Sequence, residues 1–500
     1  MLINNNNFCF EYIQAAIDLD QAAIETQLAL ATDESFAAAK AIYQEGGYSK
    51  SYAQVKLTAP LTSNISKGTA ITGKNDDGTT INGKAYEDLT AGQSEIKIQY
   101  VTSDIQATYV DCQVGALVDP NTNGCFTNGG SVTINGADYA YTYNKDTDNN
   151  NGRTIQGFST GAEKKMYNGC PGCPYKPYKE FFDYYGQFDY ANQWVLAALD
   201  GTQTSFTKGN ADFSKYTFTG RTEAVKKGTA YMNIYMYVIR EFYDAIDDCQ
   251  SGCINCNDDP VHAWDEGVAF YTGSSQSKLG YTLGEKRCAN FKTCGTNAKD
   301  ASLEGTAKIN YDLMDQFHQG QYNLLVGNCV AAKDNADRIV DLMAVPLIQG
   351  TMRYAYKVDR LQGEEKEKAE GAVFAAAVLP KLNACNADDA QTVYNNMRVG
   401  AFSTNFNDVK AAFENNYKCL GIICDDIGGL WNDATGDYYV DAEPCRDRMS
   451  VANRKTSPLA LGLGIGGAAV AVVALLFVGY MIKREKTGKP LFEGEAKTMA

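Results

Sequence analysis

The chain contains only two histidines, and the first lies in a stretch rich in metal-ligand side chains, PVHAWDEGVAFYTGS (residues 260–274). His262, Asp265 and Glu266 are spaced i, i+3 and i+4, so a helix would place them on one side. Tyr271 follows within the same stretch. An imidazole, two carboxylates and a phenol are hard, oxygen-rich ligands, which suit a trivalent or hard divalent metal ion. The stretch is therefore a candidate metal site.

The second histidine has a similar setting in the segment NYDLMDQFHQGQYNLL. Tyr311, Asp315, His318 and Tyr322 are spaced i, i+4, i+7 and i+11, which makes one continuous stripe on a helix. Asp315, His318 and Tyr322 are therefore further candidate metal ligands. Spacing alone leaves an alternative open, in which both histidines are partly buried, hydrogen-bonded side chains of a helical domain and the tyrosines belong to its core.

Three residues could bind a small anion. Arg153 and Thr154 are adjacent in the polar segment DTDNNNGRTIQGFST, and a guanidinium beside a hydroxyl can hold a planar anion. A solvated turn is the alternative interpretation of that segment. Arg353 lies in a largely apolar segment, residues 346–360, that is expected to be helical. A buried arginine needs a counter-charge, so Arg353 is the third candidate.

Composition narrows the class of partner. The chain has 500 residues and a formal net charge of -15, which argues against nucleic acid or anionic lipid as a partner. It has 32 tyrosines against 21 phenylalanines. Tyrosine is frequent at half-buried positions, and its phenolate is also a good ligand for a hard metal ion. The length is sufficient for a large core and for two to three domains.

A membrane anchor is expected near the C-terminus. Residues 459–482 carry no charge and could cross a bilayer of about 30 Å. A basic run follows, so residues 483–500 are expected to form a cytoplasmic tail and residues 1–456 to lie outside the cytosol. The predicted location is the plasma membrane, with endosomal vesicles during uptake. The start MLINNNNFCFEY is not a signal peptide, and we expect the leader to be missing from this sequence.

The 15 cysteines agree with an extracellular domain, since scattered cysteines in an oxidising compartment usually form disulfides. CPGC, with Cys170 and Cys173, is expected to be disulfide-bonded. A zinc site built from CPGC and CINC (Cys253 and Cys256) is the alternative. Asn64, in NIS, matches the glycosylation pattern of secreted proteins.

Periodicity predicts a mostly α fold with a β-rich insert. Apolar residues at helical spacing indicate helices over 35–46, 222–248 and 346–360. The charged segment GEEKEKAEG (residues 363–371) is expected to be a solvated face. Short strand-like runs separated by Asp-Gly and Asn-Gly turns predict a β-hairpin-rich insert. The expected organisation is a first half over 8–220 with the insert at 60–145, a second helical half over 221–435, and a stalk over 437–456.

Three stretches together resemble the algal phytotransferrins, the low-iron-inducible iron-assimilation proteins of green algae and diatoms. They are GCFTNGGSVTINGADYAYTYNKDTDNNNGRTIQGFST, the CPGCPY to FFDYYG segment, and PVHAWDEGVAFYTGS. The resemblance covers about residues 100–430, and the C-terminal span is similar to that of membrane-anchored diatom members. It implies a cell-surface binder of ferric iron, with carbonate as a synergistic anion and delivery by endocytosis, and not an enzyme.

Carried onto this sequence, the resemblance assigns His262, Asp265, Glu266 and Tyr271 to the metal, and the NGRT loop to the anion. Acidification would protonate ligands and carbonate and so release iron. The tail triplet PLF, residues 490–492, is a candidate contact for endocytic machinery.

Two rival functions remain. A structural or adhesive disulfide-rich surface glycoprotein would use the tyrosines and cysteines only for folding. A metal-dependent surface enzyme is disfavoured, because the sequence has no nucleotide-binding glycine loop, nucleophile elbow or HExxH motif.

Overall fold

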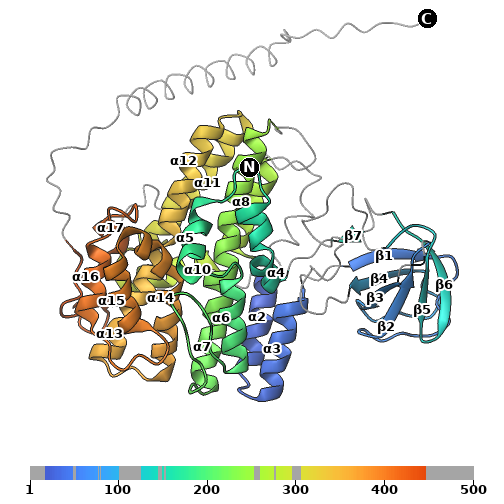
Figure 1. Ribbon diagram of the computed structural model, residues 1–500, viewed down its shortest axis with the longest axis horizontal. Helices are drawn as coiled ribbons and strands as arrows, with labels where there is room; N and C mark the ends of the chain where they lie inside the picture. Colours follow the sequence, from blue (N-terminus) through green and yellow to red (C-terminus); the bar gives the residue numbers. More distant parts are fainter. Residues whose placement is uncertain are drawn as a thin grey trace, which may run out of the picture. The chain divides into compact units, whose positions relative to one another are not determined.

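The computed structural model describes residues 17–48, 52–76, 78, 80–100, 126–144, 149–150, 154–252, 260–274, 278–295 and 306–445. Helices dominate, which confirms the mostly α prediction (Figure 1). They are α2 (Ile17–Leu28), α3 (Asp33–Glu45), α4 (Ile155–Thr160), η2 (Lys164–Asn168), α5 (Lys176–Tyr185), α6 (Tyr190–Asp200), α7 (Phe218–Gly228), η3 (Thr229–Ile234), α8 (Tyr235–Gln250), α9 (Pro260–Thr272), α10 (Gly280–Phe291), α11 (Lys308–Leu325), α12 (Cys329–Met343), α13 (Val345–Arg360), α14 (Glu365–Cys385), α15 (Ala387–Met397), α16 (Phe406–Glu414) and α17 (Cys424–Ile427).

The helix predicted over 222–248 is present, but it changes its winding in the middle. α7, η3 and α8 follow one another without a break, and η3 is a π-helical segment. The side chain of Thr217 accepts a hydrogen bond from Thr219 N and so caps the start of α7. The hydroxyl of Thr229 donates to the Val225 carbonyl at 2.9 Å, where the winding changes. π segments occur mostly as single turns inside α-helices and often at functional sites.

The helices share one hydrophobic core that includes residues from Ile17 to Ala442. α9 reaches this core through Trp264, which is 0% exposed and whose ring lies 4.7 Å from that of Phe242 on α8. Glycine allows the close approach of α9 and α11, since a Cβ at Gly320 would collide with the Trp264 ring. The indole of Trp264 also donates to the Phe317 carbonyl of α11 at 3.0 Å.

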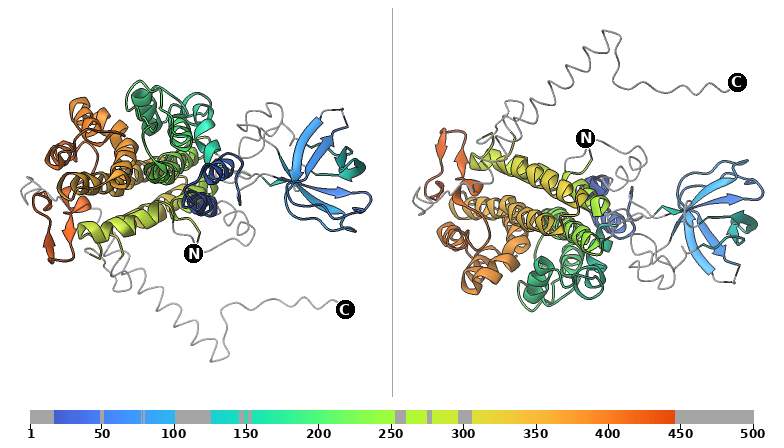
Figure 2. Two further views of the ribbon diagram at one scale, coloured as in Figure 1. Left: turned by 90° about the horizontal axis from the view of Figure 1, so that it is seen from below. Right: turned by 90° about the horizontal axis from the view of Figure 1, so that it is seen from above.

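Six antiparallel strands form a closed sheet with a core of its own (Figure 2). β1 pairs with β4 on one side and with β6 on the other, so the order β1-β4-β3-β2-β5-β6 returns to β1. The strands are β1 (Tyr52–Leu57), β2 (Ala70–Lys74), β3 (Thr80–Ala85), β4 (Glu95–Tyr100), β5 (Ser131–Ile134) and β6 (Ala137–Thr142), with β7 (Asn149–Asn150) beside β1. A separate two-stranded sheet joins β8 (Trp431–Asn432) and β9 (Asp437–Tyr438).

The predicted β-rich insert is therefore more than a set of hairpins. Its strands begin at Tyr52, earlier than expected, and their inward side chains form a second core. Phe126 fills the interior against Gly73, where a Cβ would leave no room for the ring. The alternating burial of β2 and β6 is the pattern of strands with one face inward and one face outward. Alternation predicts strands, but it does not say that the first and last strands meet.

Five disulfides join described residues: Cys170–Cys173, Cys249–Cys329, Cys288–Cys294, Cys385–Cys419 and Cys424–Cys445. The disulfide expected in CPGC is confirmed, so its two sulfurs are not thiolate ligands for zinc. Cys253 and Cys256 lie outside the described residues.

The predicted span at residues 459–482 also lies outside the described part of the chain. Within the described part, no helix has both the length and the apolar character needed to cross a membrane.

Candidate functional site

The two histidine-bearing helices, α9 and α11, pack side by side in opposite directions. Asp265, near the start of α9, accepts a hydrogen bond at 2.7 Å from the side-chain amide of Gln321, near the end of α11. Tyr271, at the end of α9, donates at 2.9 Å to the side-chain oxygen of Asn310, near the start of α11. The structure therefore brings together two segments that the sequence identified independently.

On α9, two of the predicted ligand side chains, His262 and Glu266, are in contact. The His262 Nε2 atom lies 3.4 Å from the Glu266 Oε1 atom, as the i, i+4 spacing predicts. Glu266 is buried, with 4% of its surface exposed, whereas His262 and Asp265 are half-buried. Within the described residues, no set of three or more His, Cys, Asp or Glu side chains is arranged as a metal site. The imidazole of His262 and the carboxylates of Asp265 and Glu266 are thus available along α9 without forming a preassembled site.

Tyr271 lies in the core instead of at this edge. It is 2% exposed, and its hydroxyl is hydrogen-bonded to Asn310. Burial, followed by the charge of Glu285, raises the pKa of Tyr271 well above its usual value. The side chain is therefore a neutral phenol with a structural role, and ligation of a metal would require it to lose both its burial and its hydrogen bond.

The predicted stripe on α11 lies on the solvent side of that helix. Asp315, His318 and Tyr322 are all exposed, and Tyr322 has 64% of its surface accessible. Asp315 accepts a hydrogen bond at 2.8 Å from Gln319, one turn further along. The alternative of partly buried histidines with tyrosines in the core is therefore wrong for this stripe, whereas it holds on α9, where His262 is half-buried and Tyr271 lies in the core.

The three anion candidates are in different situations. Arg153 lies outside the described residues. Thr154 caps the start of α4, since its hydroxyl accepts a hydrogen bond from Gly157 N at 2.9 Å. Arg353 is half-buried on α13, as expected from the sequence, and its guanidinium lies 5.2 Å from the ring centre of Tyr354. No ion pair with Arg353 occurs among the described residues.

α8 carries a buried ion-pair cluster that was not predicted from the sequence. Arg240 is 9% exposed and pairs with Glu241, which is 0% exposed, and with Asp244 at 2.6 Å. Burial alone would lower the pKa of Arg240, but the two carboxylates outweigh it and raise the pKa well above its usual value. The i, i+4 spacing of Arg240 and Asp244 was visible in the sequence, but their burial was not.

A second buried cluster corrects the interpretation of GEEKEKAEG as a solvated face. Glu370 is only 6% exposed and lies 2.8 Å from the Nζ atom of Lys227, which also pairs with Glu223. Burial would raise the pKa of Glu370, but Lys227 outweighs it and holds the pKa below its usual value. The last turn of the charged segment therefore faces the core, because α14 packs against α7 at this point.

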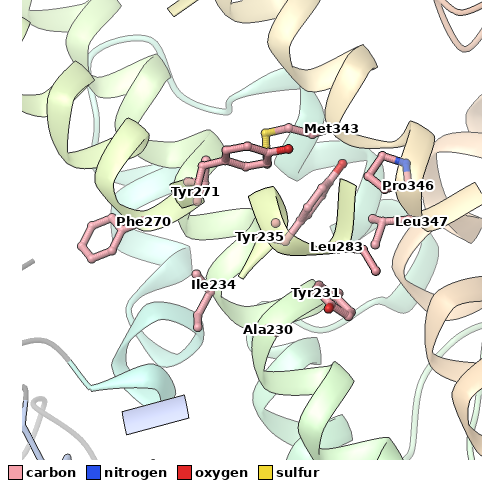
Figure 3. A pocket seen from close by; sticks show the side chains of 12 residues that line it. Ala230, Tyr231, Ile234, Tyr235, Phe270, Tyr271, Leu283, Met343, Pro346 and Leu347 are labelled. Carbon is pink, nitrogen blue, oxygen red and sulfur yellow. The ribbon is translucent and has the colours of Figure 1, made fainter. Parts of the chain in front are cut away.

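The core also encloses a cavity of about 20 Å³ that is lined mainly by aromatic and aliphatic side chains. Tyr231, Tyr235 and Tyr271 line it from η3, α8 and α9 (Figure 3). The hydroxyl of Tyr235 is buried and has no hydrogen-bond partner among the described residues. A cavity of this size has room for about one water molecule, so it is not a site for an organic substrate.

Comparison with known proteins adds no family assignment: no family model matches the chain, and neither a curated protein nor a solved structure is significantly similar to it. The candidate sites are therefore judged by their own chemistry.

Proposed function

We propose that this chain is a cell-surface protein that binds ferric iron for uptake, and that iron is captured at the edge where α9 meets α11. One observation carries the proposal, the hydrogen bond between Asp265 and Gln321. His318 lies three residues before Gln321, and residues three apart are neighbours on a helix surface. In the proposed site, His318 of α11 joins the α9 side chains His262, Asp265 and Glu266.

The chemistry of this edge suits a hard metal ion. Asp265 and Glu266 offer carboxylate oxygens, and His262 and His318 offer imidazole nitrogens. Tyr322, four residues after His318 and exposed, replaces the buried Tyr271 as the available phenol. The exposed side chains of α11 are not fixed by core packing and can reorient towards α9. Carbonate is proposed to fill the remaining coordination positions.

The wider proposal is that residues 459–482 anchor the protein in the plasma membrane. The cytoplasmic tail, residues 483–500, is proposed to bind the endocytic machinery that carries the protein into endosomes. Disulfides in the described domain support an oxidising compartment outside the cytosol. Iron binding requires neutral imidazoles and ionised carboxylates, so a fall in pH competes with the metal. Acidification after endocytosis is proposed to release the iron.

The test is a titration of the purified full-length chain with Fe(III), with and without bicarbonate, in which the visible phenolate-to-iron charge-transfer band is followed. We expect a saturable band that depends on bicarbonate and is lost in Tyr322→Phe. His318→Ala and Asp265→Asn should weaken iron binding, because each removes a ligand from one side of the edge.

Tyr271→Phe is the matched control, since it removes a buried phenol from the same helix pair and should leave the band unchanged. A band lost in Tyr271→Phe but kept in Tyr322→Phe would assign the phenolate to the core and refute the proposed edge. Wild-type protein that binds no iron would favour the alternative, a structural or adhesive surface glycoprotein.

A further inference from the structure

One buried basic side chain differs from the others in the described part of the chain. Lys165 donates to the Tyr237 hydroxyl at 2.8 Å, Lys381 contacts Asp341 at 3.2 Å, and Arg240 has its two carboxylates. Arg287, on α10, is 7% exposed, yet its Nε and Nη1 atoms have no hydrogen-bond partner among the described residues. An arginine remains charged in proteins, so it cannot avoid the cost of burial by losing its proton.

Two aromatic rings lie close to this guanidinium and offer cation–π contacts, but not hydrogen-bond acceptors. Its central carbon lies 5.6 Å from the ring centre of Phe374 and 5.9 Å from that of Tyr354. The ring of Tyr231 stacks on Phe374 at 5.4 Å, which extends the flat apolar wall. Aromatic faces attract a cation, but they offer no acceptors in the plane of the guanidinium. The Nε and Nη1 groups of Arg287 therefore still lack an acceptor among the described residues.

The surrounding charges do not supply that acceptor. The carboxylate of Glu370 is close enough to act on Arg287, but it is bound to Lys227 at 2.8 Å. Two further basic residues, Lys286 and Arg353, lie near Arg287, and neither has an ion pair among the described residues. Burial, followed by the charge of Arg353, lowers the pKa of Arg287. In a chain of net charge -15, this is a local excess of positive charge.

We propose that Arg287, Arg353 and Lys286 form a binding site, the arginine site, for the carboxylate group of a small organic anion. A carboxylate supplies both the missing acceptor and the missing negative charge. Phosphate carries more charge and more acceptor oxygens, and an aromatic setting satisfies it less well.

The arginine site shares no residue with the proposed iron edge and does not depend on iron binding. It is tested by calorimetric titration of the full-length chain with succinate, without iron, at a constant ionic strength set by sodium fluoride. We expect saturable binding to the wild type. Arg287→Met should weaken it at least about tenfold, since a hydrogen bond to a charged group is lost.

Arg398→Met is the matched control, because Arg398 is exposed and its loss changes the net charge equally. It should bind succinate like the wild type. Equal binding by Arg287→Met and the wild type, or no saturable binding by the wild type, would overturn the proposal. Tighter binding of inorganic phosphate than of succinate would overturn the choice of a carboxylate.

Two outer variants keep the test decisive if Arg287→Met does not fold. Lys286 is exposed and Arg353 is half-buried, so the variants Lys286→Met and Arg353→Met should both fold. Each should reduce succinate affinity several-fold while its unfolding midpoint without succinate stays near that of the wild type. Unchanged succinate affinity in both variants would refute the site.

Discussion

Two buried arginines of the helical domain have opposite surroundings. Arg240 and Arg287 are 9% and 7% exposed, so each loses nearly all contact with water. Arg240 pairs with two carboxylates on its own helix, whereas Arg287 has no ion pair within the described residues and lies near two further cations. Correspondingly, the pKa of Arg240 is raised and that of Arg287 is lowered.

This difference separates a structural group from a binding group. A buried ion pair is costly to break, because the partner that remains is an uncompensated buried charge. A buried cation without a partner is costly to keep, and it persists in a protein when something other than stability requires it. Arg240 is therefore expected to stabilise the fold, and Arg287 to have been retained for a ligand. Stability measurements on three variants test this contrast.

The largest effect is expected for Arg240→Met. The substitution removes the cation that faces Glu241, which is 0% exposed, and Asp244. We expect the free energy of unfolding in urea at neutral pH to fall by about 3–5 kcal/mol. A loss below about 1 kcal/mol would mean that these carboxylates do not depend on Arg240, and the contrast would disappear.

A smaller and pH-dependent loss is expected for Glu370→Gln. Lys227 keeps Glu223 as a partner, so the loss at neutral pH should be about 2 kcal/mol. The folded-state pKa of Glu370 lies below its usual 4.5, so the stability from its ionisation is present above that value. It is lost as the pH falls through the depressed pKa.

Urea unfolding of both proteins between neutral and acidic pH tests this linkage. The difference in stability between wild type and Glu370→Gln should shrink as the pH falls below 4.5. A difference that stays constant, or grows, on acidification would show that Glu370 is not an ionised partner of Lys227. Glu367→Gln is a suitable control, since Glu367 lies on the same helix and is more exposed.

The smallest effect, with the opposite sign, is expected for Arg287→Met. Removal of an uncompensated buried cation should raise the unfolding free energy of the anion-free chain by about 1 kcal/mol. Saturating succinate should reverse the order, because only the wild type gains stability from binding. A loss comparable to that of Arg240→Met would show that Arg287 is also a structural group.

The sequence predicted local features better than contacts between distant segments. The helix expected over 35–46 is α3, and the one expected over 346–360 is α13, because apolar periodicity and glycine stops are local signals. The contact of His262 with Glu266 follows from i, i+4 spacing alone. The helical segment that carries Arg353 was also predicted, and the arginine is half-buried on it.

The features that were missed depend on partners far along the chain. The burial of Glu370 requires Lys227, which is 143 positions away, and nothing in GEEKEKAEG indicates which glutamate will meet it. Tyr271 is held by a hydrogen bond to Asn310, which lies on α11, 39 positions further along the chain. Arg287, in the ordinary-looking segment GYTLGEKRCANF, is unusual only once its surroundings are known.

The π segment η3 bears on how this chain can be compared with others. A π turn holds more residues than an α turn, so residues before and after Thr229–Ile234 are out of phase with a regular helix. Across this offset, Lys227 faces α14, whereas Tyr235 lines the cavity together with Tyr231 and Tyr271. A relative with an uninterrupted α-helix here would carry one residue fewer. An alignment without a gap would then shift every position of α8 by one residue and, for example, match Arg240 to a position that does not face Asp244.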